Sequence, residues 1–263
     1  MKDIAIITGA SSGIGKEFTF QVAQKYNFDE IIIIARREEK LNEIAGEINS
    51  KAGKNLIRPV PMDITGKEGA ERFKTFIEKE KDFYIGLLIN NAGFGTYGPF
   101  AETSINRQME MIDLNCISLT GICGASLPYL KKNSVIINTA SLAAFLPLGN
   151  FAVYAASKAY VLSFSIALAA ELKDKGIKVC ALCPGSVSSE FANVASNGAR
   201  KEVKGGFPPQ KVVAQCLKRA FKGKKVSLYR TKWNITAFMS HFIGRYICAR
   251  YTYKYNKRPH NPD

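Results

Sequence analysis

Short apolar runs alternate with amphipathic segments along most of the chain. Residues 4–8, 31–34 and 56–62 are apolar and rich in β-branched side chains, and each run precedes a segment with apolar residues at helical spacing. The four isoleucines at 31–34 are typical of a strand that is buried on both faces of a parallel sheet. Further strands are predicted over 86–90, 134–139, 177–183 and 225–229, and helices over 13–26, 38–51, 67–81, 101–130, 151–173 and 210–221.

Strand–helix alternation of this kind favours a parallel sheet with helices on both faces. Right-handed crossovers then give a doubly wound, Rossmann-type α/β sheet of about seven strands, which binds ligands at the carboxyl ends of its strands. The length of 263 residues fits one such domain, and no repeat or low-complexity linker divides it. Residues 1–263 are therefore expected to form a single domain.

The net charge of +15 is concentrated at one end of the chain. Residues 196–263 contain 16 Lys and Arg against 2 Asp and Glu, whereas residues 1–195 contain 21 against 20. The basicity is therefore a property of the last quarter of the sequence. No recognised nucleic-acid-binding module accompanies it, so we do not expect a nucleic-acid partner.

The same last quarter contains an apolar stripe. Between residues 233 and 258, apolar side chains at helical spacing are flanked by cations, which predicts a basic amphipathic C-terminal extension. Such a helix can pack on its own domain or a partner subunit, cover a substrate site, attract an acidic substrate, or make a weak contact with an anionic membrane surface. The stripe consists of Trp233, Ile235, Phe238, Met239, Phe242, Ile243, Tyr246 and Ile247.

The cysteines indicate a reducing compartment. Six cysteines occur without a dense pattern, no export signal is apparent, and the longest uncharged apolar stretch, 159–170, is too short to span a bilayer. Cys180 and Cys183 lie three residues apart in a predicted strand, so they point to opposite faces and are interpreted as buried structural thiols. We therefore expect a cytoplasmic protein without a metal site.

A glycine-rich turn, TGASSGIG, follows the first predicted strand and opens the first predicted helix. Glycine permits positive φ and a close approach of the backbone to a ligand. The free N–H groups and the positive dipole end of the helix can bind a pyrophosphate. The predicted nucleotide-binding residues in this turn are Gly9, Ser11, Ser12, Gly13, Ile14 and Gly15.

Two arginines, Arg36 and Arg37, follow the second predicted strand. An acidic residue at this place would accept hydrogen bonds from the ribose hydroxyls of NAD. A guanidinium suits the additional 2′-phosphate of NADP instead. The sequence therefore favours NADP as the cofactor, with NAD the less favoured choice.

Tyr154 and Lys158 are four residues apart in the predicted helix 151–173, so they share one helix face. A tyrosine with the usual pKa of about 10 is a poor acid–base catalyst at neutral pH, but a nearby ammonium stabilises its phenolate. Ser141, which ends the strand before this helix, supplies a hydroxyl close in sequence. We therefore predict a proton-transfer site in which Lys158 lowers the pKa of Tyr154.

Together and in this order, these motifs resemble the short-chain dehydrogenase/reductase family over residues 1–190. The resemblance also rests on Asp63 after the third strand, the segment NNAG at 90–93, Asn115 in the long helix, and Pro184-Gly185 after the sixth strand. It implies an oxidoreductase that transfers hydride between a nicotinamide cofactor and a carbonyl or alcohol. The family is commonly oligomeric, so a homodimer or homotetramer is expected.

The resemblance also implies a role for each matching residue. Tyr154 would exchange a proton with the substrate oxygen, Ser141 would hydrogen-bond that oxygen, and Lys158 would also hold the nicotinamide ribose. Asn115 would anchor a water that links Lys158 to solvent. Contacts with adenine would come from Asp63 and Ile64, and other cofactor contacts from Asn91, Ala92, Gly93, Pro184, Gly185 and Val187, with Ser189 in the place of a frequent threonine.

The loops after the strands predict an apolar substrate site. Its expected ligand is a hydrophobic ketone or secondary alcohol, with a steroid-like or acyl-chain skeleton, and residues 190–210 are expected to form a mobile lid. A 3-oxoacyl reductase acting on a CoA or carrier-protein conjugate and a membrane-surface lipid reductase are the alternatives. The predicted apolar lining is Leu142, Phe145, Leu146, Leu148, Phe151 and Phe191.

A nucleotide sensor or scaffold without catalysis is a competing class of function. Such a protein should have lost at least one of Ser141, Tyr154 and Lys158, yet all three are present. The sequence therefore favours an enzyme.

Overall fold

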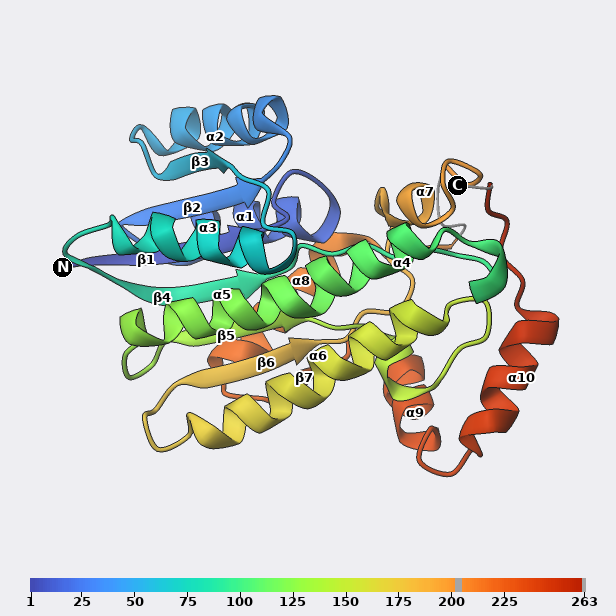
Figure 1. The fold of residues 1–263 in the computed structure, drawn as a ribbon. Helices are drawn as coiled ribbons and strands as arrows, with labels where there is room; N and C mark the ends of the chain where they lie inside the picture. The colour runs from blue at the N-terminus through green and yellow to red at the C-terminus, as the bar shows by residue number, and fades with distance from the viewer. Residues whose placement is uncertain (202–204, 262–263) are drawn as a thin grey trace.

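The computed structural model describes residues 1–201 and 205–261, and within them seven parallel strands form one sheet (Figure 1). The strand order is β3-β2-β1-β4-β5-β6-β7, which is the doubly wound arrangement that the sequence predicts. The order reverses between β1 and β4, so a topological switch point lies at their carboxyl ends. The strands are β1 (Lys2–Thr8), β2 (Glu30–Ala35), β3 (Ile57–Pro61), β4 (Phe83–Asn90), β5 (Val135–Thr139), β6 (Lys178–Leu182) and β7 (Val226–Ser227).

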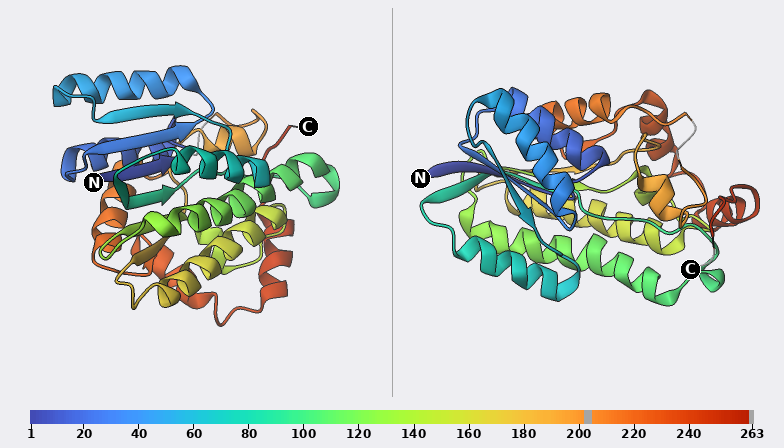
Figure 2. Two further views of the ribbon diagram at one scale, coloured as in Figure 1. Left: turned by 60° about the vertical axis from the view of Figure 1, so that its left-hand side comes forward. Right: turned by 90° about the horizontal axis from the view of Figure 1, so that it is seen from above.

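Helices cover the sheet on both faces (Figure 2). One layer contains α1 (Gly13–Lys25), α2 (Glu38–Ala52) and α8 (Pro209–Phe221). The other layer contains α3 (Gly66–Glu78), α5 (Leu119–Ser126) and α6 (Ala152–Glu171). Because both faces are covered, central strands can be apolar throughout: the four isoleucines at 31–34 in β2 have no exposed surface. Cys180 and Cys183 are buried free thiols.

The long helix predicted over 101–130 is divided into segments. A 3₁₀ turn (Phe100–Glu102) precedes α4 (Ile105–Ile112), and a π-helical segment (Asp113–Ser118) joins α4 to α5. A second 3₁₀ turn (Leu127–Tyr129) ends the region. A π-helical segment inside an α-helix is uncommon and frequently marks a functional site. Here it contains Asn115.

The C-terminal extension is not the single helix that its apolar spacing predicts. It forms α9 (Thr231–Met239) and α10 (Arg245–Tyr255), with a turn at 240–244 and Gly244 as the N-cap of α10 (Figure 1). Trp233 is buried, whereas Phe242 is 69% exposed and Ile247 is 68% exposed. Most of the apolar stripe therefore faces outward.

The two ends of the segment after β6 pair with each other. Val187 forms a parallel bridge with Phe207, and α7 (Phe191–Ala195) lies between them. Of the lid predicted over 190–210, residues 202–204 lie outside the described part of the chain. The C-terminal segment returns to α7 after α10, because Asn261 N–H donates to the carbonyl oxygen of Ser196 at 3.0 Å (Figure 1).

Two helical regions, Ile105–Tyr129 and α6, are long and apolar enough by length and composition to cross a membrane, although the stretch 159–170 alone is not. Both lie along one face of the sheet, and 44% of each apolar window is buried in the fold (Figure 1). Covering helices of an α/β sheet pass the same test of length and hydropathy, so this is weak evidence for a membrane span.

Candidate active site

The glycine-rich turn holds β1, α1 and the loop after β4 in close contact. A Cβ atom at Gly15 would lie 2.1 Å from the carbonyl oxygen of Gly9, so no other residue fits there without a shift. Within the described residues, the N-cap Ser12 makes no side-chain capping bond to α1. The first backbone N–H groups of α1 can therefore serve an anionic ligand. Ser11 and Gly13 lie in the same turn, and Ile14 packs against the core.

Thr8 fixes the loop after β4 against the end of β1. Its hydroxyl oxygen accepts hydrogen bonds from the backbone N–H groups of Asn91 at 3.0 Å and Ala92 at 3.1 Å. The side-chain amide of Asn91 donates to the carbonyl oxygens of Thr8 and Gly9, both at 3.3 Å. Asn91, Ala92 and Gly93 are thereby placed opposite the glycine-rich turn, and their contact with the cofactor stays a prediction. Thr8 was not among the predicted site residues.

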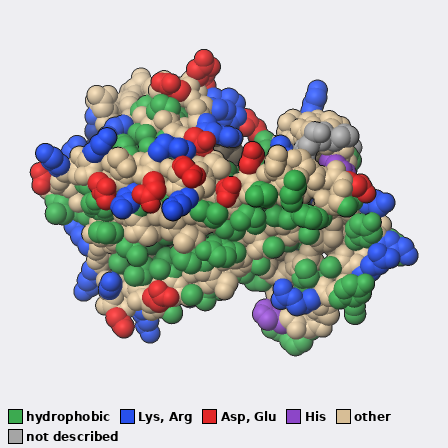
Figure 3. All heavy atoms as spheres, viewed as in Figure 1, with side chains coloured by type: hydrophobic (Ala, Val, Ile, Leu, Met, Phe, Trp, Pro, Cys, Tyr) green, Lys and Arg blue, Asp and Glu red, His purple; other side chains and the backbone are tan. Residues whose placement is uncertain are grey.

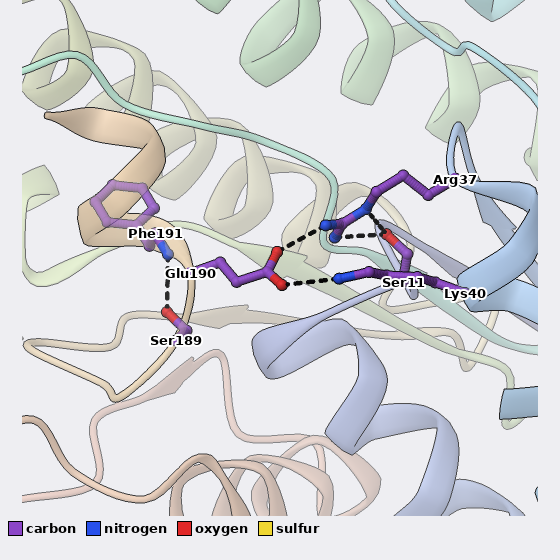
Figure 4. Close-up of polar contacts among 6 residues, drawn as sticks. All are labelled: Ser11, Arg37, Lys40, Ser189, Glu190 and Phe191. Carbon is purple, nitrogen blue, oxygen red and sulfur yellow. Dashed lines mark hydrogen bonds and ion pairs between the residues drawn. The ribbon is translucent and has the colours of Figure 1, made fainter. Parts of the chain in front are cut away.

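A hollow of about 450 Å³ opens beside the glycine-rich turn, and Ser11, Ser12 and Lys40 contribute to its wall. Arg37 lies next to it and donates to the Ser11 hydroxyl from Nε at 3.2 Å and from Nη2 at 3.0 Å (Figure 4). Lys40 lies about one helical turn after Arg37, on α2. Arg36 and Arg37 are both exposed at the end of β2. Of the two predicted arginines, Arg37 is the one that contacts the turn.

Asp63 and Ile64 follow β3 at the same edge of the sheet. Ile64 is buried, and the Asp63 carboxylate accepts hydrogen bonds from the Thr65 N–H at 3.0 Å and the Thr65 hydroxyl at 2.6 Å. Burial acts to raise the pKa of Asp63, but these hydrogen bonds and the charges of Arg36 and Arg72 lower it below its usual value. Asp63 is therefore an ionised carboxylate at neutral pH.

Tyr154, Ser141 and Lys158 lie together at the carboxyl ends of β4, β5 and β6. Burial raises the pKa of Tyr154 to about 12, and the hydrogen bond with the Ser141 side chain opposes this shift only in part. Desolvation of the buried phenol is the largest influence on this pKa. That Lys158 lowers the pKa of Tyr154 stays a prediction.

The Lys158 ammonium is buried and lies 5.8 Å from the centroid of the Tyr154 ring. It donates a 2.8 Å hydrogen bond to the carbonyl oxygen of Thr139 at the end of β5. Burial lowers the pKa of Lys158 to about 8. An ammonium has three donors, so Lys158 keeps hydrogen-bonding capacity for a ligand beside Gly93.

Asn115 is fully buried and joins three elements of the site. Its side-chain amide donates to the carbonyl oxygen of Phe94 at 2.9 Å and to the Ser157 hydroxyl at 3.1 Å, and its Oδ1 accepts from the Phe94 N–H at 3.1 Å. A Cβ atom at Gly93 would lie 2.6 Å from Asn115 Oδ1 and 3.3 Å from Lys158 Nζ. Asn115 and Lys158 thus border one narrow space that glycine leaves open.

Aromatic rings enclose the Tyr154 side chain. Phe151 stacks on Tyr154 with ring centroids 4.1 Å apart, and Phe191 lies 5.4 Å away. Arg258, from the segment after α10, lies over the rings of Tyr97 at 4.7 Å and Phe151 at 5.2 Å. Leu148 belongs to this cluster, as predicted, whereas Leu142 and Phe145 pack against the main core of the sheet. Leu146 is half-buried.

The loop after β6 borders the same site. Pro184 and Val187 are buried, and the Pro184 carbonyl oxygen accepts a hydrogen bond from the Ser141 hydroxyl at 3.4 Å. The Trp233 indole of α9 packs on Gly185 so closely that a Cβ atom there would lie 2.5 Å from the ring. Ser189 uses its hydroxyl to accept a hydrogen bond from the Phe191 N–H at 3.3 Å (Figure 4).

Glu190 and Lys40 are members of the site that sequence reasoning missed. The Glu190 carboxylate lies 2.8 Å from Arg37 Nη1 and 3.2 Å from Lys40 Nζ (Figure 4). Lys40 had a signal in the sequence, since it follows Arg37 by three residues on a predicted helix. Glu190 had none, because its partners are 150 and 153 residues away.

The comparisons with known proteins agree with this geometry. The family model described as short chain dehydrogenase matches residues 3–199. The chain belongs to the short-chain dehydrogenase family. It is accordingly an oxidoreductase that acts on CH–OH or keto groups with a nicotinamide cofactor. The matched region includes every predicted catalytic residue and ends before α8, so α9 and α10 lie beyond it.

Relatives within the short-chain dehydrogenases have several activities. An uncharacterized oxidoreductase of Staphylococcus epidermidis is 32% identical over 76% of this chain and 84% of its own length. A very-long-chain 3-oxoacyl-CoA reductase of Coccidioides immitis is 34% identical over 72% of this chain, and 17-beta-hydroxysteroid dehydrogenase type 3 of Mus musculus is 34% identical over 75%. The matches span 55% and 64% of these two relatives' own lengths.

Solved structures show the same fold. A short-chain dehydrogenase from Sphingobium yanoikuyae in complex with NADPH superposes with a TM-score of 0.79 at 25% identity, covering 91% of this chain and 94% of that one. One from Burkholderia phymatum in complex with NAD has a TM-score of 0.81 at 20% identity, covering 99% and 97%. Both nucleotides thus occur on this fold.

Proposed function

We propose that this short-chain dehydrogenase is an NADP-dependent carbonyl reductase for hydrophobic ketones, running in reverse as an alcohol dehydrogenase. The observation that carries the proposal is the place of Tyr154, with Ser141 and Lys158, at the edge of the sheet where Arg37 and Lys40 border the glycine-rich turn. One part of this edge offers proton chemistry, and another offers cations for a phosphate.

The residues present fit a dinucleotide. Gly93 leaves open a space that a Cβ atom would fill, between Asn115 Oδ1 and the Lys158 ammonium. The hollow beside Ser11 and Ser12 is open to a phosphate group and has two cationic side chains at its border. Lys158 would hold the nicotinamide ribose, and the first N–H groups of α1 would hold the pyrophosphate. When bound, the reduced nicotinamide supplies the hydride.

Tyr154 supplies the proton in this proposal. A phenol whose pKa is about 12 stays protonated at neutral pH, so it can donate a proton to a carbonyl oxygen. The Ser141 hydroxyl would hold that oxygen, and the Lys158 ammonium would stabilise the phenolate that forms. At neutral pH the same high pKa leaves little phenolate to take a proton from an alcohol, so we expect the enzyme to act mainly on ketones.

The substrate side favours an apolar ligand. Phe151, Phe191 and Tyr97 surround Tyr154, and such walls suit a steroid-like skeleton or an acyl chain. The names of two relatives, a 3-oxoacyl-CoA reductase and a hydroxysteroid dehydrogenase, support the same range of substrates. A 3-oxoacyl thioester of CoA or a carrier protein is the second candidate, because Arg258 brings a cation to the aromatic cluster.

Two surfaces suit assembly of this enzyme. Hydrophobic side chains gather over α5, α6 and the π-helical segment before α5, where Tyr160, Ile166 and Ile117 are each more than 40% exposed (Figure 3). We assign this face to a second copy of the chain, as a homodimer or homotetramer, which light scattering in solution would test. The outward stripe of α9 and α10 fits a weak contact of a cytoplasmic enzyme with an anionic membrane surface.

The test is turnover of a panel of ketones, with NADPH and NADH in parallel runs. We expect oxidation of NADPH with bulky apolar ketones and slower oxidation of NADH. Absence of turnover with every ketone, or faster turnover with NADH, would contradict the proposal.

A further inference from the structure

Glu190 connects the loop after β6 to the residues at the start of α2. Its two carboxylate oxygens are divided between two cations, with Oε2 at 2.8 Å from Arg37 Nη1 and Oε1 at 3.2 Å from Lys40 Nζ (Figure 4). The Ser12 hydroxyl also hydrogen-bonds to this carboxylate. Arg37 and Lys40 belong to the β2–α2 region, so the contact crosses from one half of the doubly wound sheet to the other.

The groups that bind Glu190 are those that would bind a phosphate. Arg37 and Ser11 are joined by two hydrogen bonds, and Ser12 and Lys40 line the hollow beside them. A guanidinium, an ammonium and two hydroxyls around one point form an anion site of the kind that recognises a phosphate monoester. In this structure a carboxylate of the chain itself takes that place. Among the described residues, the ion pairs of Arg37 and Lys40 are both with Glu190.

We propose that Glu190 is an internal competitor for the 2′-phosphate of NADP(H), and that the nucleotide must displace its carboxylate from Arg37 and Lys40 to bind fully. The inference rests on the proposed preference for NADP. A phosphate dianion beside the Glu190 carboxylate meets like-charge repulsion, so the two anions compete for Arg37 and Lys40. NAD lacks the 2′-phosphate and leaves the contact intact. Glu190 thus determines how strongly the enzyme distinguishes the two nucleotides.

The contact also links the nucleotide to the reaction centre. Glu190 is the N-cap of α7, and the next residue, Phe191, has its ring centroid 5.4 Å from that of Tyr154. On the other side, the Ser189 Cβ lies 3.0 Å from the place of a Cβ at Gly13, where α1 begins. Release of Glu190 therefore frees the start of α7, and the Phe191 ring on Tyr154 moves with it. Binding of the 2′-phosphate therefore changes the packing around Tyr154, where the ketone binds.

Binding of three nucleotides to Glu190→Gln and the unchanged enzyme tests the competition. The probes are NADP⁺, NAD⁺ and adenosine 2′-monophosphate, titrated by calorimetry. We expect Glu190→Gln to bind NADP⁺ and adenosine 2′-monophosphate about five-fold more tightly, the size typical of one exposed ion pair. NAD⁺ affinity should not change. The gain should shrink in 0.5 M salt, because charges at this exposure are screened.

Glu43→Gln is the matched control, because Glu43 borders the same hollow but is not an ion-pair partner of Arg37 or Lys40. An equal gain in Glu43→Gln would mean a general effect of charge and would overturn the proposal. So would unchanged or weaker binding of adenosine 2′-monophosphate by Glu190→Gln. If NADH outperforms NADPH in turnover while Glu190→Gln still gains affinity for adenosine 2′-monophosphate, the competition stands and the cofactor preference fails.

Backbone hydrogen exchange tests the link to Tyr154. Adenosine 2′-monophosphate should speed exchange in residues 190–196 of the unchanged enzyme, and Glu190→Gln should show fast exchange there without any ligand. Slow exchange in Glu190→Gln would overturn the claim that the carboxylate holds α7 in place.

Discussion

The Lys158 ammonium donates a 2.8 Å hydrogen bond to the carbonyl oxygen of Thr139. This bond joins α6 to the end of β5, so the position of the cation is set by the sheet as well as by its own helix. The Lys158 side chain is 5% exposed, and this burial lowers its pKa to about 8. A buried cation held in this way is prepared to stabilise a phenolate that forms on Tyr154.

Replacement of Tyr154 by Phe removes the proposed proton donor. We expect turnover to fall by about 10²- to 10⁴-fold, the contribution typical of general acid catalysis. The Phe151 and Phe191 rings still pack on the new ring, so the fold and nucleotide affinity should be preserved. Steady-state turnover beside calorimetric binding checks this, and retained turnover would show that the proton comes from another group.

Replacement of Arg37 by Ala should weaken NADP⁺ binding about ten-fold, the size of a lost charge-assisted hydrogen bond. The affinity for NAD⁺ should change much less. Arg36→Ala is the control, because the Arg36 charge acts on the Asp63 carboxylate, whereas Arg37 hydrogen-bonds to Ser11. Titration of both variants with both nucleotides decides the matter. Equal losses in the two variants would mean that the arginines act only through long-range charge.

The pH dependence of turnover should follow the ionisation of the Lys158 ammonium. Its pKa is lowered from 10.5 to about 8, so the charged form predominates below pH 8 and is lost as the pH rises through that value. We therefore expect the rate of ketone reduction to fall above pH 8. In Lys158→Arg the side chain stays charged, so the remaining activity should show no such fall. An identical decline in this variant would assign the titration elsewhere.

The C-terminal stripe should respond to negative charge. In a variant with Phe242→Glu and Ile247→Glu, two side chains that are 69% and 68% exposed become anionic. We expect sedimentation with vesicles of anionic lipid for the unchanged enzyme and little for the variant, with ketone turnover retained. Vesicles of neutral lipid are the control. Equal sedimentation of both forms would exclude this stripe as the contact.

The strand–helix alternation was enough to predict the sheet. A run of apolar residues such as the isoleucines of β2 is stable only in a parallel strand that is covered on both faces. The strand predicted from this run is therefore the strand that the structure contains. The proximity of Tyr154 and Lys158 was predictable for a similar reason, because their i, i+4 spacing fixes their helix face. Strand ends that meet at one edge then bring Ser141 to the same place.

Three features could not be predicted from periodicity. The break between α9 and α10 falls inside an apolar stripe that keeps helical spacing. In the sequence, Gly244 was the residue that indicated a break there. The pKa of Tyr154 depends on how completely Phe151 and Phe191 exclude water from the phenol. The spacing of residues in the sequence does not predict this exclusion. Glu190 finds its cations across 150 residues of sequence, and long-range pairs of this kind are set by the tertiary structure.

The contact between Trp233 and Gly185 joins the C-terminal quarter of the chain to the loop after β6. The indole fills the place of a side chain beside Pro184, although Trp233 lies outside the region that the family model matches and Gly185 lies inside it. Exchange of the last helices between relatives would therefore also change the packing of the loop after β6.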